Sequence, residues 1–258
     1  MLGCIIQARM GSSRLPGKVM KKIDDDYLLD YVIKQLRSSK KIQKIIVATT
    51  NLLEDDVICD HLKPQKIDFF RGSSEDVLDR YYQCAKQYRV DVIVRITADN
   101  PLIDPNIVDL IINKYENQKC DLATNTITRT FPYGTEVEVF SFNSLKKAWE
   151  QAKKPSEREH VTPFIRDPKN GFVLSNIEYD NGNLSHIRYT VDRIEDLNLV
   201  KEIVQNISTR PILLQNIVDL YKDKPTIFQI NKNVKHDGYS KSLKKDEEYL
   251  KSQKDVET

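Results

Sequence analysis

Residues 5–18 read IIQARMGSSRLPGK, an apolar run that passes directly into a loop of glycines, serines and a proline. The run Leu2–Ile6 predicts a buried strand that ends at Gln7. The loop after it carries three cations, Arg9, Arg14 and Lys18. Glycine and serine let backbone N–H groups approach an anion closely, and arginine and lysine neutralise its charge. Because open α/β sheets bind phosphate at the carboxyl end of a strand, we predict a phosphate site here.

Two common phosphate-binding motifs do not describe this loop. For a Walker A loop, the spacing from Gly11 to Gly17 and Lys18 is one residue too long, and Val19 stands where Ser or Thr would hold magnesium. The dinucleotide fingerprint G-x-G-x-x-G is absent. The alternative is a basic surface turn, but three cations so close to the end of a buried strand favour an anion site.

The composition is that of an ordinary globular protein with 258 residues, 40% of them hydrophobic and 30% charged. The 40 basic and 38 acidic residues nearly cancel, so nothing favours broad nucleic-acid binding. No signal segment and no membrane-length apolar run is evident, so we expect a cytoplasmic protein without membrane contact. The cysteines are scattered and suggest neither a zinc site nor a disulfide framework; Cys4 and Cys84 have apolar neighbours and are predicted to be buried thiols.

Strands and helices are expected to alternate through the first half of the chain. After the first strand, strands are predicted at 45–50, 68–70, 91–96 and 121–125, and helices at 27–37, 54–62, 75–88 (with Ser74 as its cap) and 105–116. This alternation predicts α/β architecture with a mostly parallel, Rossmann-like nucleotide-binding sheet. Near-continuous apolar strands indicate helices on both faces.

The pattern changes after Asn125. We expect an antiparallel or edge strand at 135–142, helices at 145–152 and 157–166, strands at 172–179 and 187–191, and helices at 195–207 and 212–223. This predicts one domain over residues 1–239, with a small antiparallel and helical insertion at about 126–186. From residue 240 the chain is polar, and we expect a frayed helix or a disordered tail.

Acidic residues follow two of the predicted strands. Asp99 comes after the strand at 91–96 and just before a proline turn, a placement typical of a carboxylate that holds magnesium against phosphate oxygens. Asp104 precedes Pro105 and is better explained as a helix cap. Asp192 follows the strand at 187–191, whereas Asp196 in the next helical turn is explained by the helix dipole.

The opening IQARMGSSRLPGK resembles the signature of the cytidylyltransferases that make CMP-activated sugar acids, including the acylneuraminate and 3-deoxy-manno-octulosonate enzymes. It is most similar to the spore-coat polysaccharide protein F branch. The segments DNPL (99–102) and TVDRIEDL (190–197) resemble further signatures, so the resemblance runs from Ile5 to about Val200. Gln7 departs from the proline of the best-known sugar-acid members, which leaves the acceptor open.

The resemblance implies a role for each matching residue. Arg9, Lys18 and Asp99 would be catalytic, and Asp99 and Asp192 would hold one or two Mg²⁺ ions. The residues expected to bind the nucleotide are Gln7, Ala8, Arg9, Gly11, Ser12, Ser13, Arg14, Lys18, Thr49, Arg71 and Gly72.

Candidate acceptor contacts lie in the insertion. Glu136 and Glu138 share one face of the strand at 135–142, and Arg158 and His160 lie in the segment SEREHVTP (156–163). Such clusters can hydrogen-bond sugar hydroxyls or ammonium groups. A capping box from Ser156 to Glu159 explains part of the second cluster without any ligand. The same segments recur in the protein F branch.

We therefore expect transfer of CMP from CTP to a nonulosonic-acid-like sugar, with release of pyrophosphate; a phosphonate or polyol phosphate is the second choice of acceptor. One rival is a nucleotide-sugar glycosyltransferase, whose D-x-D motif has its nearest counterpart in residues 24–26. Another is a non-catalytic nucleotide-binding protein. The resemblance also implies a homodimer, with the strand at 135–142 as its arm. No role is assigned to His236.

Overall fold

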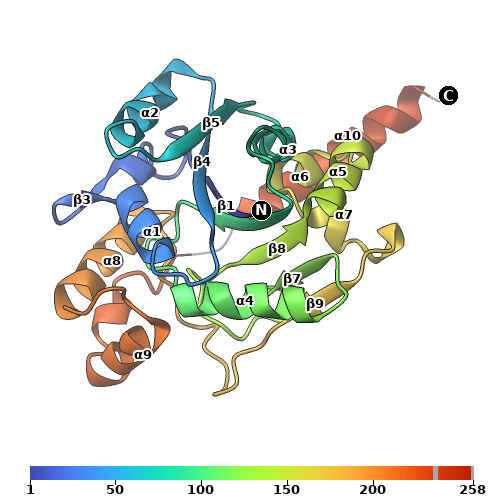
Figure 1. Ribbon diagram of the computed structural model, residues 1–258. Helices are drawn as coiled ribbons and strands as arrows, with labels where there is room; N and C mark the ends of the chain where they lie inside the picture. Colours follow the sequence, from blue (N-terminus) through green and yellow to red (C-terminus); the bar gives the residue numbers. More distant parts are fainter. Residues whose placement is uncertain (235–237, 257–258) are drawn as a thin grey trace.

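A seven-stranded sheet forms the centre of the protein, which the computed structural model describes over residues 1–234 and 238–256 (Figure 1). The strand order is β5-β4-β1-β6-β8-β7-β9. The strands are β1 (Leu2–Gln7), β4 (Lys44–Thr50), β5 (Asp68–Gly72), β6 (Val92–Thr97), β7 (Leu122–Thr124), β8 (Glu138–Ser141) and β9 (Leu174–Asn176). Strands β5, β4, β1 and β6 are parallel, and β8 runs antiparallel to both of its neighbours. A separate hairpin joins β2 (Lys22–Ile23) and β3 (Asp26–Tyr27).

Helices cover both faces of this sheet. They are α1 (Leu28–Leu36), α2 (Asp56–Leu62), α3 (Val77–Tyr88), α4 (Pro105–Asn117), α5 (Phe142–Gln151), α6 (Pro155–His160), α7 (Pro163–Arg166), α8 (Ile194–Asn206), α9 (Leu214–Asp223) and α10 (Gly238–Val256). On β1, Cys4 and Ile6 belong to the core cluster that contains α1, α4 and α8, whereas Ile5 faces the cluster with α3 and α5. The expected sheet, mostly parallel and buried on both faces, is confirmed.

The strand expected at 135–142 was to be antiparallel or at an edge, and the antiparallel alternative is confirmed, whereas the strand expected at 187–191 was wrong. Strand β8 is not an edge strand, because it pairs with β6 on one side and β7 on the other. With both edges occupied, β8 cannot pair edge to edge with a strand of a second copy, and the homodimer with the segment 135–142 as its arm stays a prediction. Residues 187–191 do not form a regular strand; one isolated bridge joins Tyr133 to Arg188.

Two helix starts also differ from the expectation. Asp76, not Ser74, caps α3, and its carboxylate accepts from the Asp79 N–H at 2.8 Å. The helix expected at 157–166 is divided into α6 and α7, because Val161 takes a left-handed φ of 72°. Glu157 accepts from the Lys154 N–H at 3.0 Å, so the cap of α6 lies before Ser156.

The polar C-terminal segment forms the helix α10, which packs alongside α6 (Figure 1). Of the two expectations for this tail, the structure shows the helix. His236 lies outside the described residues. Within the described ranges, no helix combines the length and the apolar character needed to cross a membrane.

Gly134 places the loop before β8 against the core. Its φ is +117°, and an added Cβ would lie 2.4 Å from Cδ2 of the buried Tyr189. We expect Gly134→Ala to lower the free energy of unfolding by about 2 kcal/mol more than Gly182→Ala does. Gly182 has a similar φ of +104°, but no atom lies within 4 Å of the position that an added Cβ would take, so the comparison isolates the clash. Urea unfolding measures both variants, and equal losses would contradict the packing argument.

Candidate active site

The loop after β1 is closed on itself by backbone hydrogen bonds. The Met10 carbonyl accepts from the N–H groups of Ser12 at 2.8 Å and Gly17 at 2.9 Å. The Met10 N–H donates to Asp55 Oδ1 at 2.6 Å, which ties the loop to the start of α2. Gly17 takes a φ of +66°, and the short helix from Lys18 begins directly after it. The loop is therefore held in one shape before any ligand arrives.

The ends of two distant segments meet opposite this loop. The Asp99 carbonyl accepts from the Val191 N–H at 2.8 Å, which places Asp192 beside the end of β6. Lys18 Nζ donates to Asp99 Oδ2 at 3.0 Å, to Asp192 Oδ1 at 3.0 Å and to the Val191 carbonyl at 2.8 Å. The structure thus gathers Lys18, Asp99 and Asp192 into one cluster.

Two arginines also contact the Asp192 carboxylate. Arg14 donates to Oδ1 at 2.6 Å, and Arg188 donates to Oδ2 at 2.8 Å while also pairing with Asp196. Burial raises the pKa of Asp192, but the charge of Lys18 and the hydrogen bonds of Arg188, Arg14 and Lys18 outweigh it and hold the pKa well below its usual range. Burial lowers the pKa of Lys18, but its two carboxylate partners raise it above the ordinary value. Both groups are charged at neutral pH.

The oxygen atoms of this cluster fit a magnesium ion. Two carboxylates and a carbonyl converge on the Lys18 ammonium, and hard oxygen ligands are those that Mg²⁺ prefers. The ammonium lies among these oxygens, so a magnesium ion at the same position would have to displace it. No group of three or more Asp, Glu, His or Cys side chains that could hold a metal occurs in the described part of the chain. A metal here would therefore also take oxygen ligands from the nucleotide.

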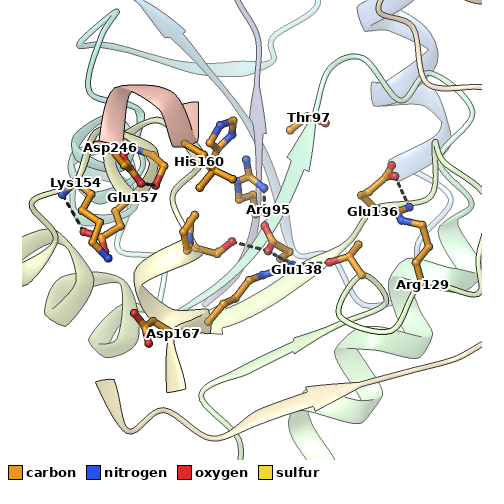
Figure 2. A pocket seen from close by; sticks show the side chains of 16 residues that line it. Arg95, Thr97, Arg129, Glu136, Glu138, Lys154, Glu157, His160, Asp167 and Asp246 are labelled. Atoms are coloured by element: carbon orange, nitrogen blue, oxygen red, sulfur yellow. Dashed lines mark hydrogen bonds and ion pairs between the residues drawn. The ribbon is translucent and has the colours of Figure 1, made fainter. Parts of the chain in front are cut away.

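Two cavities adjoin at this end of the sheet. The loop cavity, about 410 Å³, lies between the β1 loop and the cluster around Lys18. The insertion cavity, about 570 Å³, lies beside β8 and α6 (Figure 2). The two share Arg95, Thr97 and His160 in their walls. The two cavities therefore adjoin at these three side chains.

Most of the predicted nucleotide residues line the loop cavity. They are Gln7, Arg9, Gly11, Ser12, Ser13, Arg14 and Lys18, together with Asp99 and Asp192. The remaining four line neither cavity. Ala8 and Thr49 are buried in the core, and Gly72 packs against Phe70 and Arg80. Arg71 donates to the carbonyls of Thr50 at 3.0 Å and Leu52 at 2.9 Å and pairs with Asp56, so in this structure it fixes the loop after β4.

Glu138 lies in the wall of the insertion cavity (Figure 2). Its carboxylate pairs with Arg95 at 2.5 Å and Arg166 at 2.6 Å and accepts from the Thr162 hydroxyl at 2.6 Å. Burial raises its pKa, but the two arginines outweigh burial and lower the pKa to about 2. Because these partners occupy both oxygens, Glu138 holds the two guanidinium groups in place.

The other predicted acceptor residues are not all in the cavity wall. Glu136 lines the insertion cavity and pairs with Arg129 at 2.6 Å. His160 lines both cavities, and its Nε2 lies 2.8 Å from Ser242 Oγ. Burial lowers the pKa of His160. Arg158 lines neither cavity; it pairs with Asp76 and donates to the Trp149 carbonyl at 2.8 Å, which holds α6 to α3 and α5.

A family model described as cytidylyltransferase matches residues 3–234 of this chain. The chain belongs to the cytidylyltransferase family. An uncharacterized protein of Methanocaldococcus jannaschii is 39% identical over 236 residues, which cover 91% of this chain and 96% of that protein. The spore coat polysaccharide biosynthesis protein SpsF of Bacillus subtilis is 35% identical over 213 residues, 80% and 88% of the two chains. The structure of a cytidylyltransferase from Leptospira borgpetersenii superposes with a TM-score of 0.85 at 33% identity, covering 91% of this chain and 99% of that one.

Several residues of this cytidylyltransferase site were missed by the sequence reasoning. Arg95 and Arg188 are charged residues within apolar segments, a signal that would have singled them out. Ser242 and Lys245 reach the loop cavity from α10, more than forty residues after Asp192. No local pattern marks them, because their surroundings are uniformly polar.

Proposed function

We propose that this cytidylyltransferase transfers CMP from CTP to an oxygen of an acidic sugar and releases pyrophosphate. The observation that carries the proposal is the Lys18 ammonium, held by Asp99 and Asp192 beside Arg14 in the wall of the loop cavity, which adjoins a second cavity. Positive charge is already placed where a triphosphate would lie. Placement of charge before the reaction is the main way that proteins accelerate phosphoryl transfer.

In this proposal the loop cavity binds the triphosphate of CTP. Arg9, Arg14 and Lys18 bind its oxygens and offset the charge that grows on the departing pyrophosphate. The acceptor hydroxyl oxygen forms a bond to the α-phosphorus and gives its proton to solvent, while the bond from that phosphorus to the oxygen that bridges the α- and β-phosphates breaks and this oxygen leaves with pyrophosphate. Asp99 and Asp192 would hold Mg²⁺, which when bound neutralises phosphate charge and orients the leaving group. Arg188 and Asp196 keep Asp192 in place for this role.

The insertion cavity would bind the acceptor. Arg95, Arg129 and Arg166 line it and suit a carboxylate, whereas Glu136 suits sugar hydroxyls. The resemblance of the opening loop to the sugar-acid enzymes supports an acidic sugar, and so does the polysaccharide role in the name of the Bacillus relative. A phosphonate or polyol phosphate is the second candidate, because guanidinium groups pair with phosphate oxygens as well as with carboxylates.

The test is incubation of the protein with Mg²⁺, each of the four NTPs and a panel of sugar acids, phosphonates and polyol phosphates, following pyrophosphate release. We expect release with CTP alone among the nucleotides and with one acidic sugar. Asp99→Asn should lower turnover at least a hundredfold, in line with the loss of a group that stabilises developing charge. Asp60→Asn, an exposed aspartate on α2 outside both cavities, is the matched control.

Each rival gives a different result in this assay. A glycosyltransferase would release a nucleoside diphosphate; its nearest D-x-D counterpart, residues 24–26, lies in the β2–β3 hairpin and outside both cavities. A non-catalytic nucleotide-binding protein would bind CTP without turnover, and Asp99→Asn would then change nothing that the assay measures. No pyrophosphate with CTP and any acceptor would overturn the proposal.

A further inference from the structure

Helix α10 forms part of the wall of both cavities, although it begins at Gly238, beyond the family match that ends at residue 234. Ser242 and Lys245 line the loop cavity, and Leu243 and Asp246 line the insertion cavity. Figure 2 shows Asp246 and His160 on the side of the insertion cavity where α10 passes. The helix therefore lies over the place where the two cavities meet.

Asp246 anchors this helix in register. Its carboxylate accepts from the Ser156 N–H at 2.8 Å and from the Ser156 hydroxyl at 2.5 Å, and both side chains are buried. One turn earlier, Ser242 Oγ donates to Glu159 Oε2 at 3.0 Å and lies 2.8 Å from His160 Nε2. These contacts fix α10 on α6 through polar groups and so determine where Lys245 lies.

Among the described residues, the ion-pair partner of Lys245 is Glu159, and the pair is exposed. Its ammonium lies 3.3 Å from Glu159 Oε2, and the two side chains are 59% and 34% exposed. An exposed ion pair of this kind contributes little to stability. A triphosphate offers several negative oxygens in the cavity that Lys245 already lines, so the ammonium gains by exchanging Glu159 for a phosphate oxygen.

We propose that Lys245 is a CTP-binding residue, which α10 supplies to the loop cavity opposite Arg9, Arg14 and Lys18, and that Asp246 positions it. In this arrangement α10 closes over the triphosphate, and Glu159 keeps its hydrogen bond from Ser242. The inference rests on CTP as the nucleotide and does not depend on the acceptor.

The test compares Lys245→Gln with Lys244→Gln in the full chain. Lys244 is the neighbouring exposed lysine on α10 and lines neither cavity. CTP binding is measured by titration calorimetry with Mg²⁺, at low and at high salt. We expect Lys245→Gln to weaken CTP binding about tenfold at low salt, with a smaller loss at high salt, and Lys244→Gln to leave it unchanged. Equal affinities for the two variants would overturn the proposal.

Hydrogen exchange of α10 gives a second, independent measurement. In the wild type, CTP should slow amide exchange across residues 242–252 several-fold, and Lys245→Gln should lose this protection while Lys244→Gln keeps it. Asp246→Ala should weaken CTP binding in the same direction, because it frees the helix from Ser156; unchanged binding would overturn its positioning role. If no acceptor supports pyrophosphate release, the transferase proposal fails. The comparison of Lys245→Gln with Lys244→Gln in CTP binding needs no acceptor, so it tests the role of Lys245 separately.

Discussion

Replacing Lys18 by methionine is expected to lower kcat/KM for pyrophosphate release by about a thousandfold. The side chain becomes one atom shorter and loses the charge that Asp99 and Asp192 hold in the wall of the loop cavity. That charge is what would stabilise the departing pyrophosphate. The loss should fall mainly on kcat, because the charge on the leaving group grows in the transition state.

The matched control is Lys21→Met, one helical turn further along, since Lys21 lines neither cavity. Its kinetics should equal those of the wild type. Thermal unfolding of both variants separates a catalytic loss from a folding defect, because Lys18→Met also leaves two carboxylates without their ammonium. Turnover within threefold of the wild type in a folded Lys18→Met protein would refute the assigned role.

Replacing Glu138 by glutamine is expected to cost about 3 kcal/mol of unfolding free energy at pH 7. The carboxylate is buried between Arg95 and Arg166, and its pKa falls from 4.5 to about 2 on folding. Each pKa unit corresponds to about 1.4 kcal/mol. Loss of the carboxylate also leaves two half-buried guanidinium groups without a counter-charge, which adds to the cost.

The dependence on pH follows from the direction of this pKa shift. A depressed folded pKa contributes stability that is fully present above the unfolded value of 4.5 and is lost as the pH falls toward about 2. The difference in unfolding free energy between the wild type and Glu138→Gln should therefore become smaller as the pH falls below about 5. Urea unfolding from pH 7 to pH 3 measures it, with the exposed Glu150→Gln as the control. A difference that stays constant with pH would contradict the ion-pair argument.

The elements of the fold that could be predicted are those marked by residues adjacent in the sequence. The strand and loop at residues 2–18 were marked by an apolar run followed directly by glycines and cations. The caps and starts of several helices were marked as well; Asp104 accepts from the Asn106 N–H at 2.7 Å, as expected for its place before Pro105. The boundaries failed where side chains from other segments take part, as at Val161 between α6 and α7.

In the candidate site, too, some residues could be placed from the strand pattern and others could not. Arg9, Lys18 and Asp99 follow strands that are parallel neighbours in the sheet, so their position at one edge follows from the strand pattern. Arg71 looked equally well placed but is engaged with carbonyls of the loop after β4. A strand-end position shows that a side chain is near the ligand edge; it does not show what that side chain already binds.

The sequence by itself therefore determined the parallel sheet, the loop after β1 and the position of Asp99 after β6, because each follows from periodicity or from adjacent residues; Asp192 reaches Asp99 through a contact between distant segments. Only the tertiary structure decided that β8 enters between β6 and β7, that Glu138 neutralises Arg95, and that α10 returns to the site with Lys245. These contacts join residues that are 43 positions apart, as for Arg95 and Glu138, or 86 positions apart, as for Lys245 and Glu159. Contacts between such distant residues depend on packing and charge in the folded state, and no periodic pattern in the sequence marks them.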